Sequence, residues 1–196
     1  MADRDKNKEV EERLVDLASD TQMLYDPAYT WFVEQGPDIT RALVQGLDDE
    51  YLGSVGHGRI LRLLGHFAQE ETLPAILKAL RKGLNRHDSI VIFAAMDALA
   101  TFHTLEATDA LVALLQEHDP DIVKHTALLL GQTGDSSAVG PLVRLLAAES
   151  PSIRYSAVQG LVQLDDPAVR TVLQHHRQRE TDPEVRELIE SALAGQ

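Results

Sequence analysis

The fold is decided by the stretch DPDIVKHTALLLGQTGDSSAVGPLVRLL, residues 119–146. It begins with Asp-Pro, a pair that favours a helix start, because Asp accepts an unpaired backbone N–H and proline loses no hydrogen bond at the first helical position. The core positions that follow recur at i, i+4, i+7 and i+8, which form one face of an α-helix. A second amphipathic segment follows Gly134-Asp135. The stretch therefore predicts two helices joined by a turn.

This unit recurs along the chain. Four ten-residue segments align without gaps: VIFAAMDALA from Val91, IVKHTALLLG from Ile122, IRYSAVQGLV from Ile153 and VRELIESALA from Val185. Their starts are 31, 31 and 32 residues apart, and a weaker copy, GHGRILRLLG, starts 35 residues before Val91. The eighth and tenth positions are often Gly or Ala, which lets a neighbouring helix approach closely. Because one helix pair cannot cover its own apolar face, we expect stacked pairs.

A second amphipathic pattern lies between the copies. It comprises EETLPAILKALRKGL from Glu70, LEATDALVALLQE from Leu105, SSAVGPLVRLLAAE from Ser136 and PAVRTVLQHHRQRE from Pro167. Residues 1–47 do not repeat, and we expect them to form an acidic helical cap. One helix of this cap would bury Val10, Leu14, Leu17 and Ala18, and a short second helix would run through residues 28–33, after Asp26-Pro27. The repeat array is expected over residues 48–196, and the fold class is all-α.

The motif D-P-x-[VI]-[RV], followed by L-[GA] and G-D, resembles the HEAT-like repeats described in phycobilin lyases. The resemblance covers about three-quarters of the chain, residues 48–196. It implies a right-handed α-solenoid of about five HEAT-like helix pairs behind the N-terminal cap. In such folds the helix with the V-R motif lines the concave face, and an Asp–Arg ladder joins neighbouring repeats. The resemblance assigns the ladder arginines to Arg154 and Arg186 and the turn acids to Asp119 and Asp182.

Composition and charge exclude several functional classes. The chain has 18 Lys and Arg against 31 Asp and Glu, a net charge of −13. This makes nucleic acid a poor partner, because phosphate binding relies on Lys and Arg releasing counterions. The chain has no cysteine, which excludes disulfides and thiol chemistry, and no apolar run reaches the length of a membrane span. The charged first residues contain no signal-peptide core, so we expect a cytoplasmic protein that does not contact membranes.

Motifs for chemistry are weak. The sequence has no HExxH motif and no pair of histidines four residues apart. It also lacks the His-Glu dipeptides on which deoxyhypusine hydroxylase, a HEAT-like metalloenzyme, relies. The string GSVGHG, residues 53–58, has no preceding strand and no Lys-Ser/Thr ending, so we expect close helix packing there, not a phosphate loop. We predict no catalytic residue, cofactor or metal, and no enzymatic activity.

One basic block stands out in this acidic chain. Residues 51–100 contain six basic side chains against four acidic ones, and the basic ones are Arg59, Arg62, Lys78, Arg81, Lys82 and Arg86. One interpretation is a solvated helix face with cations near a helix C-terminus, where they offset the helix dipole. The other interpretation is a docking patch for an acidic partner. The first is favoured.

Positions three and seven of the aligned segments point away from the core stripe, toward the predicted concave side. The candidate partner-binding residues there are Phe93, Asp97, Lys124, Leu128, Tyr155 and Gln159, together with Arg59 and Arg62 from the weaker copy. Phe93, Leu128 and Tyr155 are apolar or aromatic where a solvated face would be charged, and exposed patches of this kind mark protein contacts. The alternative is that the superhelix buries them between repeats.

These observations predict a non-enzymatic scaffold that binds another protein or an extended peptide through its concave helix face. Two alternatives stay open. An acidic inhibitor or immunity-like protein would use the charge of −13 to steer toward a basic enzyme. A HEAT-like lyase or accessory enzyme subunit is the other alternative, because the repeats resemble those of phycobilin lyases.

Overall fold

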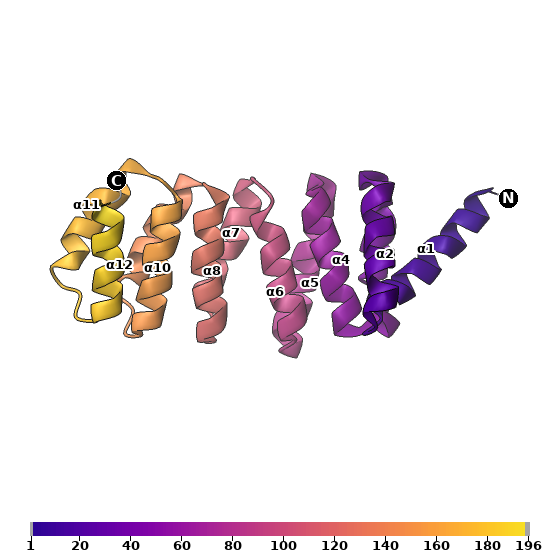
Figure 1. Ribbon diagram of the computed structural model, residues 1–196, viewed down its shortest axis with the longest axis horizontal. Helices are drawn as coiled ribbons and strands as arrows, with labels where there is room; N and C mark the ends of the chain where they lie inside the picture. Colours follow the sequence, from indigo (N-terminus) through magenta and orange to yellow (C-terminus); the bar gives the residue numbers. More distant parts are fainter. Residues whose placement is uncertain (1, 195–196) are drawn as a thin grey trace. The chain divides into compact units, whose positions relative to one another are not determined.

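The protein is described by a computed structural model, which covers residues 2–194 of the backbone and the side chains from residue 7 onward. Every regular element in that range is a helix (Figure 1). The chain forms two compact units, Met1–Phe102 and His103–Gln196, here named unit 1 and unit 2. No helix between residues 2 and 194 is both long and apolar enough to cross a membrane. The predicted all-α fold is confirmed.

Both units consist of short helices joined by tight turns. Unit 1 contains α1 (Ala2–Ala18), α2 (Gln22–Gln35), η1 (Pro37–Ile39), α3 (Thr40–Gly46), η2 (Glu50–Leu52), α4 (Gly53–Phe67), η3 (Glu70–Thr72), α5 (Leu73–Arg86) and α6 (Ser89–Ala100), where η denotes a 3-10 helix. Unit 2 contains α7 (Leu105–Leu114), α8 (Pro120–Thr133), η4 (Ser136–Ala138), α9 (Val139–Leu145), α10 (Pro151–Gln163), α11 (Pro167–Arg177) and α12 (Pro183–Ala194).

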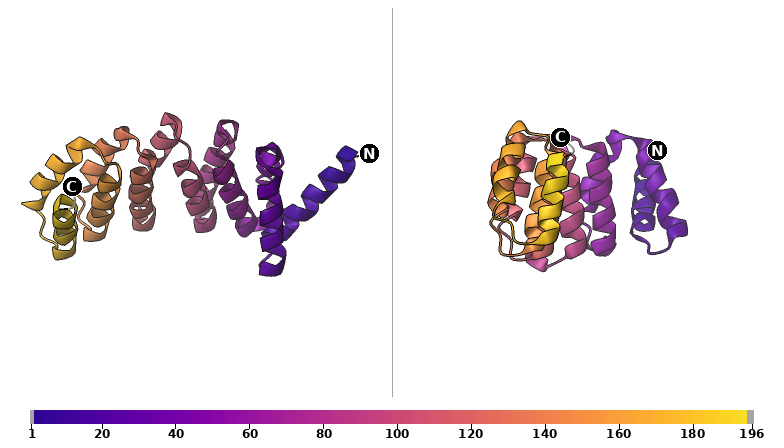
Figure 2. Two further views of the ribbon diagram at one scale, coloured as in Figure 1. Left: turned by 45° about the horizontal axis from the view of Figure 1, so that its top comes forward. Right: turned by 60° about the vertical axis from the view of Figure 1, so that its left-hand side comes forward.

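The aligned segments of the sequence are α4, α6, α8, α10 and α12, which we name the second helices. Each follows a first helix, and the first helices are α3, α5, α7, α9 and α11. The described chain therefore holds five helix pairs after α1 and α2, and the first helix of the first pair, α3, lies within residues 1–47, which were expected to belong to the cap. Second helices pack side by side within each unit, α4 on α6 in unit 1 and α8 on α10 on α12 in unit 2 (Figures 1 and 2).

The predicted helix starts are confirmed at the level of single hydrogen bonds. Asp88 accepts the backbone N–H of Val91 at 3.2 Å at the start of α6. Asp119 accepts the N–H of Asp121 at 2.8 Å, and Asp182 accepts the N–H of Glu184 at 3.0 Å, each beside a proline in the first turn. These carboxylates satisfy backbone donors that have no partner inside the helix. These caps fix where α6, α8 and α12 begin, whereas Ser150 at the start of α10 makes no side-chain cap hydrogen bond.

The second helices approach so closely that some positions have room only for hydrogen. A Cβ atom at Gly131 of α8 would lie 2.6 Å from the carbonyl oxygen of Gly160 on α10. A Cβ at Gly160 would overlap the carbonyl oxygen of Ala127. In unit 1 a Cβ at Gly65 would lie 2.8 Å from the Cα of Ala98. The small residues at the eighth and tenth positions therefore allow backbone-to-backbone packing, as the sequence predicts.

The glycine-rich string of residues 53–58 also serves packing. Gly53 has a φ of +61° at the start of α4, a conformation that side chains disfavour. A Cβ at Gly56 would lie 2.8 Å from the Cβ of Ala18, and one at Gly58 would lie 2.9 Å from Cγ2 of Ile90. These glycines bring α4 against α1 and α6, which confirms the interpretation as close packing.

The start of α2 differs from the expectation. A short helix was expected after Asp26-Pro27, over residues 28–33, but α2 begins at Gln22 and contains Pro27. The N–H groups of Leu24 and Tyr25 both bond to the carbonyl of Thr21, at 2.9 and 3.1 Å. Pro27 is the sixth residue of α2, past the first turn where proline costs least, and it removes one backbone hydrogen bond of the helix. Ala28 and Phe32 of α2 are buried, and their packing helps to offset the energetic cost of Pro27.

The close approach of α8 and α10 gives the first testable prediction. Gly160→Ala should lower the free energy of unfolding by about 1–3 kcal/mol, because the new methyl group meets backbone that cannot move aside. The matched control is Gly140→Ala in α9, where the nearest atom is Nη1 of Arg144 at 4.0 Å. This control should be neutral or stabilising by up to about 1 kcal/mol, through helix propensity. Urea unfolding of the variants measures both, and equal stability of Gly160→Ala and wild type would contradict the packing argument.

Candidate functional site

Four of the predicted partner-binding residues surround one pocket of unit 1. Arg59 and Arg62 of α4 and Phe93 and Asp97 of α6 line a hollow of about 370 Å³. The remaining lining residues are Tyr25, Val55, Gly58, Ile90 and Ala94. Phe93 is half-buried and Ile90 is 49% exposed. Positions three and seven of α4 and α6 therefore meet at one surface, which combines an aromatic ring, an aliphatic side chain and charges of both signs.

Arg59 links the end of α1 to the ring of Tyr25, which lines this pocket. Its Nη1 donates to the carbonyl oxygens of Leu17 and Ser19, at 2.7 and 2.5 Å, where α1 ends. Its guanidinium carbon lies 4.0 Å from the centre of the Tyr25 ring. A cation at a helix C-terminus offsets the helix dipole, and one over an aromatic face is attracted to it. Arg59 thus positions Tyr25, and the exposed Arg62 is the cation that an approaching molecule would meet.

The corresponding surface of unit 2 carries the other predicted residues. Lys124 of α8 and Tyr155 of α10 line a pocket of about 510 Å³, which the start of α12 borders with Asp182 and Glu184. Three serines, Ser150, Ser152 and Ser156, also line it, together with Pro151 and Val185. Lys124 pairs with Asp121 of its own helix at 2.7 Å. Seven of its nine lining residues have polar side chains, against four of nine in the pocket of unit 1.

Leu128 and Gln159 lie one helical turn beyond Lys124 and Tyr155 on α8 and α10, and both are half-buried. Phe93 and Tyr155 are also half-buried, so none of these side chains belongs to the fully buried core. Phe93 lies in unit 1 and Tyr155 in unit 2. A continuous contact stripe through both units stays a prediction.

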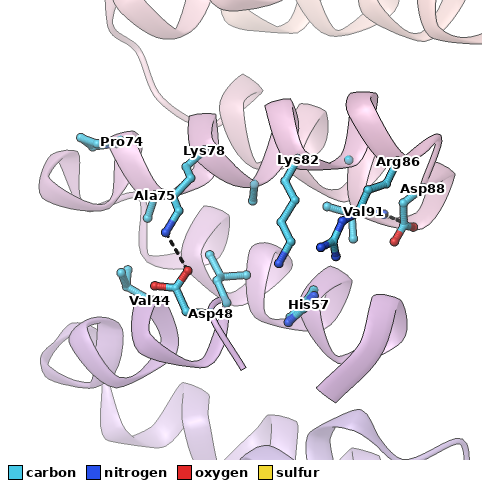
Figure 3. Close-up of a pocket in the computed structure, with 13 residues that line it drawn as sticks. Val44, Asp48, His57, Pro74, Ala75, Lys78, Lys82, Arg86, Asp88 and Val91 are labelled. Atoms are coloured by element: carbon cyan, nitrogen blue, oxygen red, sulfur yellow. Dashed lines mark hydrogen bonds and ion pairs between the residues drawn. The ribbon is translucent and has the colours of Figure 1, made fainter. Parts of the chain in front are cut away.

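A second pocket of unit 1, of about 270 Å³, lies between α3 and α5 (Figure 3). Its apolar lining comprises Val44, Leu47, Ala75, Ala79 and Val91. Lys78, Lys82 and Arg86 occupy successive turns of α5 and extend into it in Figure 3. We name this pocket the α3–α5 groove. It contains three of the six members of the basic block, whereas Arg81 is exposed and does not line it.

The cations of the α3–α5 groove pair with carboxylates from the end of α3 and from η2. Nζ of Lys78 lies 2.7 Å from Oδ1 of Asp48, and Nζ of Lys82 lies 2.7 Å from Oε1 of Glu50. Nη1 of Arg86 donates to Oε2 of Glu50 at 3.1 Å. The hydrogen bonds from Lys82 and Arg86 lower the pKa of Glu50 to about 2, and the bond from Lys78 lowers the pKa of Asp48. These pairs are exposed to water, so they add little stability.

His57 lies at the base of the same groove. It is 8% exposed, and its Nε2 lies 2.8 Å from the carbonyl oxygen of Asp49. In the resemblance to HEAT-like repeats this position belongs to the arginine column. Here the histidine ties α4 to the turn that follows α3, which fixes the turn that carries Asp48 and Glu50.

The ladder arginine Arg154 has a partner that the sequence did not indicate. Its Nε and Nη2 donate to both carboxylate oxygens of Glu180, at 2.9 and 2.7 Å, and not to Asp182. Glu180 is 3% exposed and also accepts the backbone N–H groups of Thr181 and Asp182 at 2.9 Å. Nε2 of His176 lies 3.0 Å from its Oε2. This network joins α10 to the turn between α11 and α12.

The expected roles of the ladder residues therefore change. Asp119 and Asp182 serve as helix caps, and Arg186 donates to the backbone carbonyl of Glu180. His176 and Glu180 form a His–carboxylate pair four residues apart, which no sequence motif indicated. Within the described part of the chain, no three His, Cys, Asp or Glu side chains form a group that could hold a metal ion. The surfaces above offer aromatic, aliphatic and charged contacts.

Comparison with protein-family profiles finds HEAT repeats over residues 40–130 and 124–194. The chain belongs to the HEAT repeat family. The match begins where α3 begins, so the HEAT array includes the pair α3–α4. A search of the curated proteins finds no match. The likeness to the repeats of phycobilin lyases in particular is not established by this match.

Solved structures show the same fold at low sequence identity. A designed armadillo repeat protein in complex with peptide (KR)4 is 18% identical, with a TM-score of 0.55 over 95% of this chain and 98% of that one. A chain from the structure of microtubule plus end tracking by XMAP215, CLIP-170 and EB1 is 17% identical, with a TM-score of 0.53 over 94% and 89%. Human deoxyhypusine hydroxylase is 16% identical over 98% and 97%, with a TM-score of 0.42, too low to support an argument.

The buried Glu180 gives a pH-dependent prediction for the HEAT array. Its bonds with Arg154, with backbone N–H groups and with His176 lower its pKa from 4.5 to about 2. The folded state therefore favours the ionised form, and this contribution to stability is complete above about pH 5 and disappears as the pH falls toward 2. Glu180→Gln should cost about 3 kcal/mol at pH 7, because it leaves a largely buried arginine unpaired.

Chemical unfolding between pH 7 and pH 3 measures this effect. The stability difference between wild type and Glu180→Gln should shrink as the pH falls. The exposed Glu187→Gln on α12 is the control and should change stability by less than about 0.5 kcal/mol. A difference that stays constant down to pH 3 would contradict the assignment of a lowered pKa to Glu180.

Proposed function

We propose that this HEAT-repeat protein is a non-catalytic scaffold that binds another protein or an extended peptide through its second helices. The observation that carries the proposal is the pocket of unit 1, where Phe93, Ile90 and Tyr25 gather beside the exposed Arg62. Aromatic and arginine side chains in partly desolvated hollows are the usual anchors of protein interfaces. In unit 2, Lys124 and Tyr155 likewise place a cation beside an aromatic ring at one pocket.

The half-burial of the aromatic anchors supports this interpretation. A side chain that is already held by its neighbours loses little conformational freedom when a partner covers it. Arg59 fixes Tyr25 through two backbone carbonyls and its ring contact, so that aromatic ring is preorganised. A designed armadillo protein of the same fold holds the peptide (KR)4. We propose that a peptide or protein segment likewise binds to the second helices here.

The net charge of −13 supports one specific alternative, an acidic inhibitor of a basic enzyme. Long-range attraction between opposite charges would raise the association rate and make it depend strongly on salt. A scaffold that relies on its aromatic anchors would have an association rate that depends little on salt, and truncating an anchor would weaken its binding mainly through faster dissociation. Association rates measured at two salt concentrations separate these two versions.

A HEAT-like lyase or accessory subunit, of the kind that phycobilin lyases exemplify, is the remaining proposal. Such a protein would carry or transfer a small molecule, so native mass spectrometry of protein from its own host should show a bound adduct. The scaffold predicts a stoichiometric protein partner instead. A tightly bound small molecule without any protein partner would overturn the scaffold proposal.

The anchor residues give a direct test. Wild-type protein, Phe93→Ala and Tyr155→Ala serve as parallel baits in quantitative affinity purification from the native host, and binding of the recovered partner is then measured by calorimetry. We expect each variant to weaken binding at least about tenfold, because truncating an anchor costs about 2 kcal/mol or more of binding energy. The free energy of unfolding should change much less than the 3–5 kcal/mol typical of a buried aromatic core residue.

The matched control is Tyr51→Ala, because Tyr51 is 101% exposed and lines neither surface of the second helices. This control should bind the partner as the wild type does. A large loss of stability in both Phe93→Ala and Tyr155→Ala would show that the two rings are structural. If both variants bind the partner as the wild type does, the interface does not include these two rings.

A further inference from the structure

We propose that the α3–α5 groove of unit 1 is a second binding surface, which takes an extended acidic segment of another protein. This surface lies mainly between the first helices α3 and α5, and none of its lining residues lines the second-helix pocket of unit 1, so it does not depend on that assignment. The proposal rests on three observations: the row of cations on α5, the apolar floor beneath it, and the chain's own carboxylates bound to the cations.

The row of cations is unusual in this chain. Lys78, Lys82 and Arg86 stand four residues apart, so they form one ridge along α5. They lie in the one quarter of the sequence, residues 51–100, where basic residues outnumber acidic ones, whereas the whole chain carries −13. In the structure Asp48 and Glu50 pair with all three cations, so the ridge attracts an acidic segment and disfavours a basic one only when those two carboxylates turn away.

The floor of the groove adds an apolar component. Val44 of α3 and Leu47 just after it line the hollow together with Ala75 and Ala79 of α5 and Val91 of α6. Short side chains on α5 leave the space open, and longer ones would fill it. A ligand that carries aliphatic side chains next to carboxylates would therefore satisfy both the floor and the ridge.

Asp48 and Glu50 show how carboxylates bind this ridge. Asp48 contacts Lys78 at 2.7 Å, and Glu50 bridges Lys82 at 2.7 Å and Arg86 at 3.1 Å. Both carboxylate side chains are more than 60% exposed, so they can turn into water at low cost. The carboxylates of an incoming acidic segment can take their places on the same cations. Asp48 and Glu50 then act as internal competitors for the ridge.

This competition gives a test with opposite outcomes for two double variants. The probe is a fluorescein-labelled peptide of eight residues in which Glu and Leu alternate, and fluorescence anisotropy measures its binding at about 0.1 M salt. Asp48→Asn with Glu50→Gln removes the competitors and should raise affinity about threefold to tenfold. Lys82→Glu with Arg86→Glu should lower it at least about tenfold.

Two controls isolate the groove. Arg81→Glu makes the same type of charge change on the same helix but outside the groove, and it should change affinity by no more than about twofold. A peptide of alternating Lys and Leu should not bind. Phe93→Ala should keep full affinity for the acidic probe, so a failure of the second-helix proposal leaves this result untouched. Circular dichroism melting of each variant verifies that it is folded.

Three results would overturn the proposal. The first is that neither wild type nor the Asp48→Asn, Glu50→Gln variant binds the acidic probe, which would make the ion pairs a purely structural link between α3 and α5. The second is that Arg81→Glu weakens binding as much as Lys82→Glu with Arg86→Glu does, which would show attraction without a site. The third is self-association that the Lys82→Glu, Arg86→Glu variant abolishes, which would assign the groove to a second copy of this chain.

Discussion

The close approach of the second helices is the constraint on which the other features depend. Gly131 meets Gly160, Gly160 meets the carbonyl of Ala127, and Gly65 meets Ala98, all at distances that a Cβ atom would not permit. Backbone packing of this kind buries the core stripes of α4, α6 and α8 and most of that of α10. It leaves positions three and seven on the side that no neighbouring first helix covers. The surface with Phe93 and that with Tyr155 are therefore direct consequences of how the helices stack.

Burial decides what an ion pair does in this protein. Glu50 and Glu180 both have a pKa of about 2, and in each case hydrogen bonds from cationic side chains are the main cause. Glu50 is open to water, where exchanging one partner for another costs little. Glu180 is almost fully buried and satisfies two backbone N–H groups besides Arg154, so losing it leaves several polar groups unpaired. The ion pairs of Glu50 are therefore suited to exchange with a ligand, whereas that of Glu180 with Arg154 stabilises the packing of the last helix pair.

The two kinds of helix carry different chemistry on their open sides. Second helices present aromatic and aliphatic side chains, with Phe93 in unit 1 and Tyr155 in unit 2 as the largest. The first helix α5 presents three cations above small apolar residues. Under the two proposals above, the two surfaces would take ligands of different chemistry. This would suit a protein that brings partners together, and it extends the role proposed for the second helices.

Sequence by itself determined the repeated helices from α4 onward and their packing positions, but not the start of α2 or the place of α3. The caps at Asp88 and Asp119, the buried stripe and the glycine contacts all follow from patterns within about ten residues, where backbone geometry fixes which side chains share a face. Tertiary structure alone decided that Arg154 binds Glu180, 26 residues away, and that Lys78 binds Asp48, 30 residues away. It also gave Arg59 its place at the end of α1. Each of these contacts joins a helix to a turn or helix end more than 25 residues away. The position of that distant segment is set only when the helices stack, so the residue pattern within one helix cannot predict it.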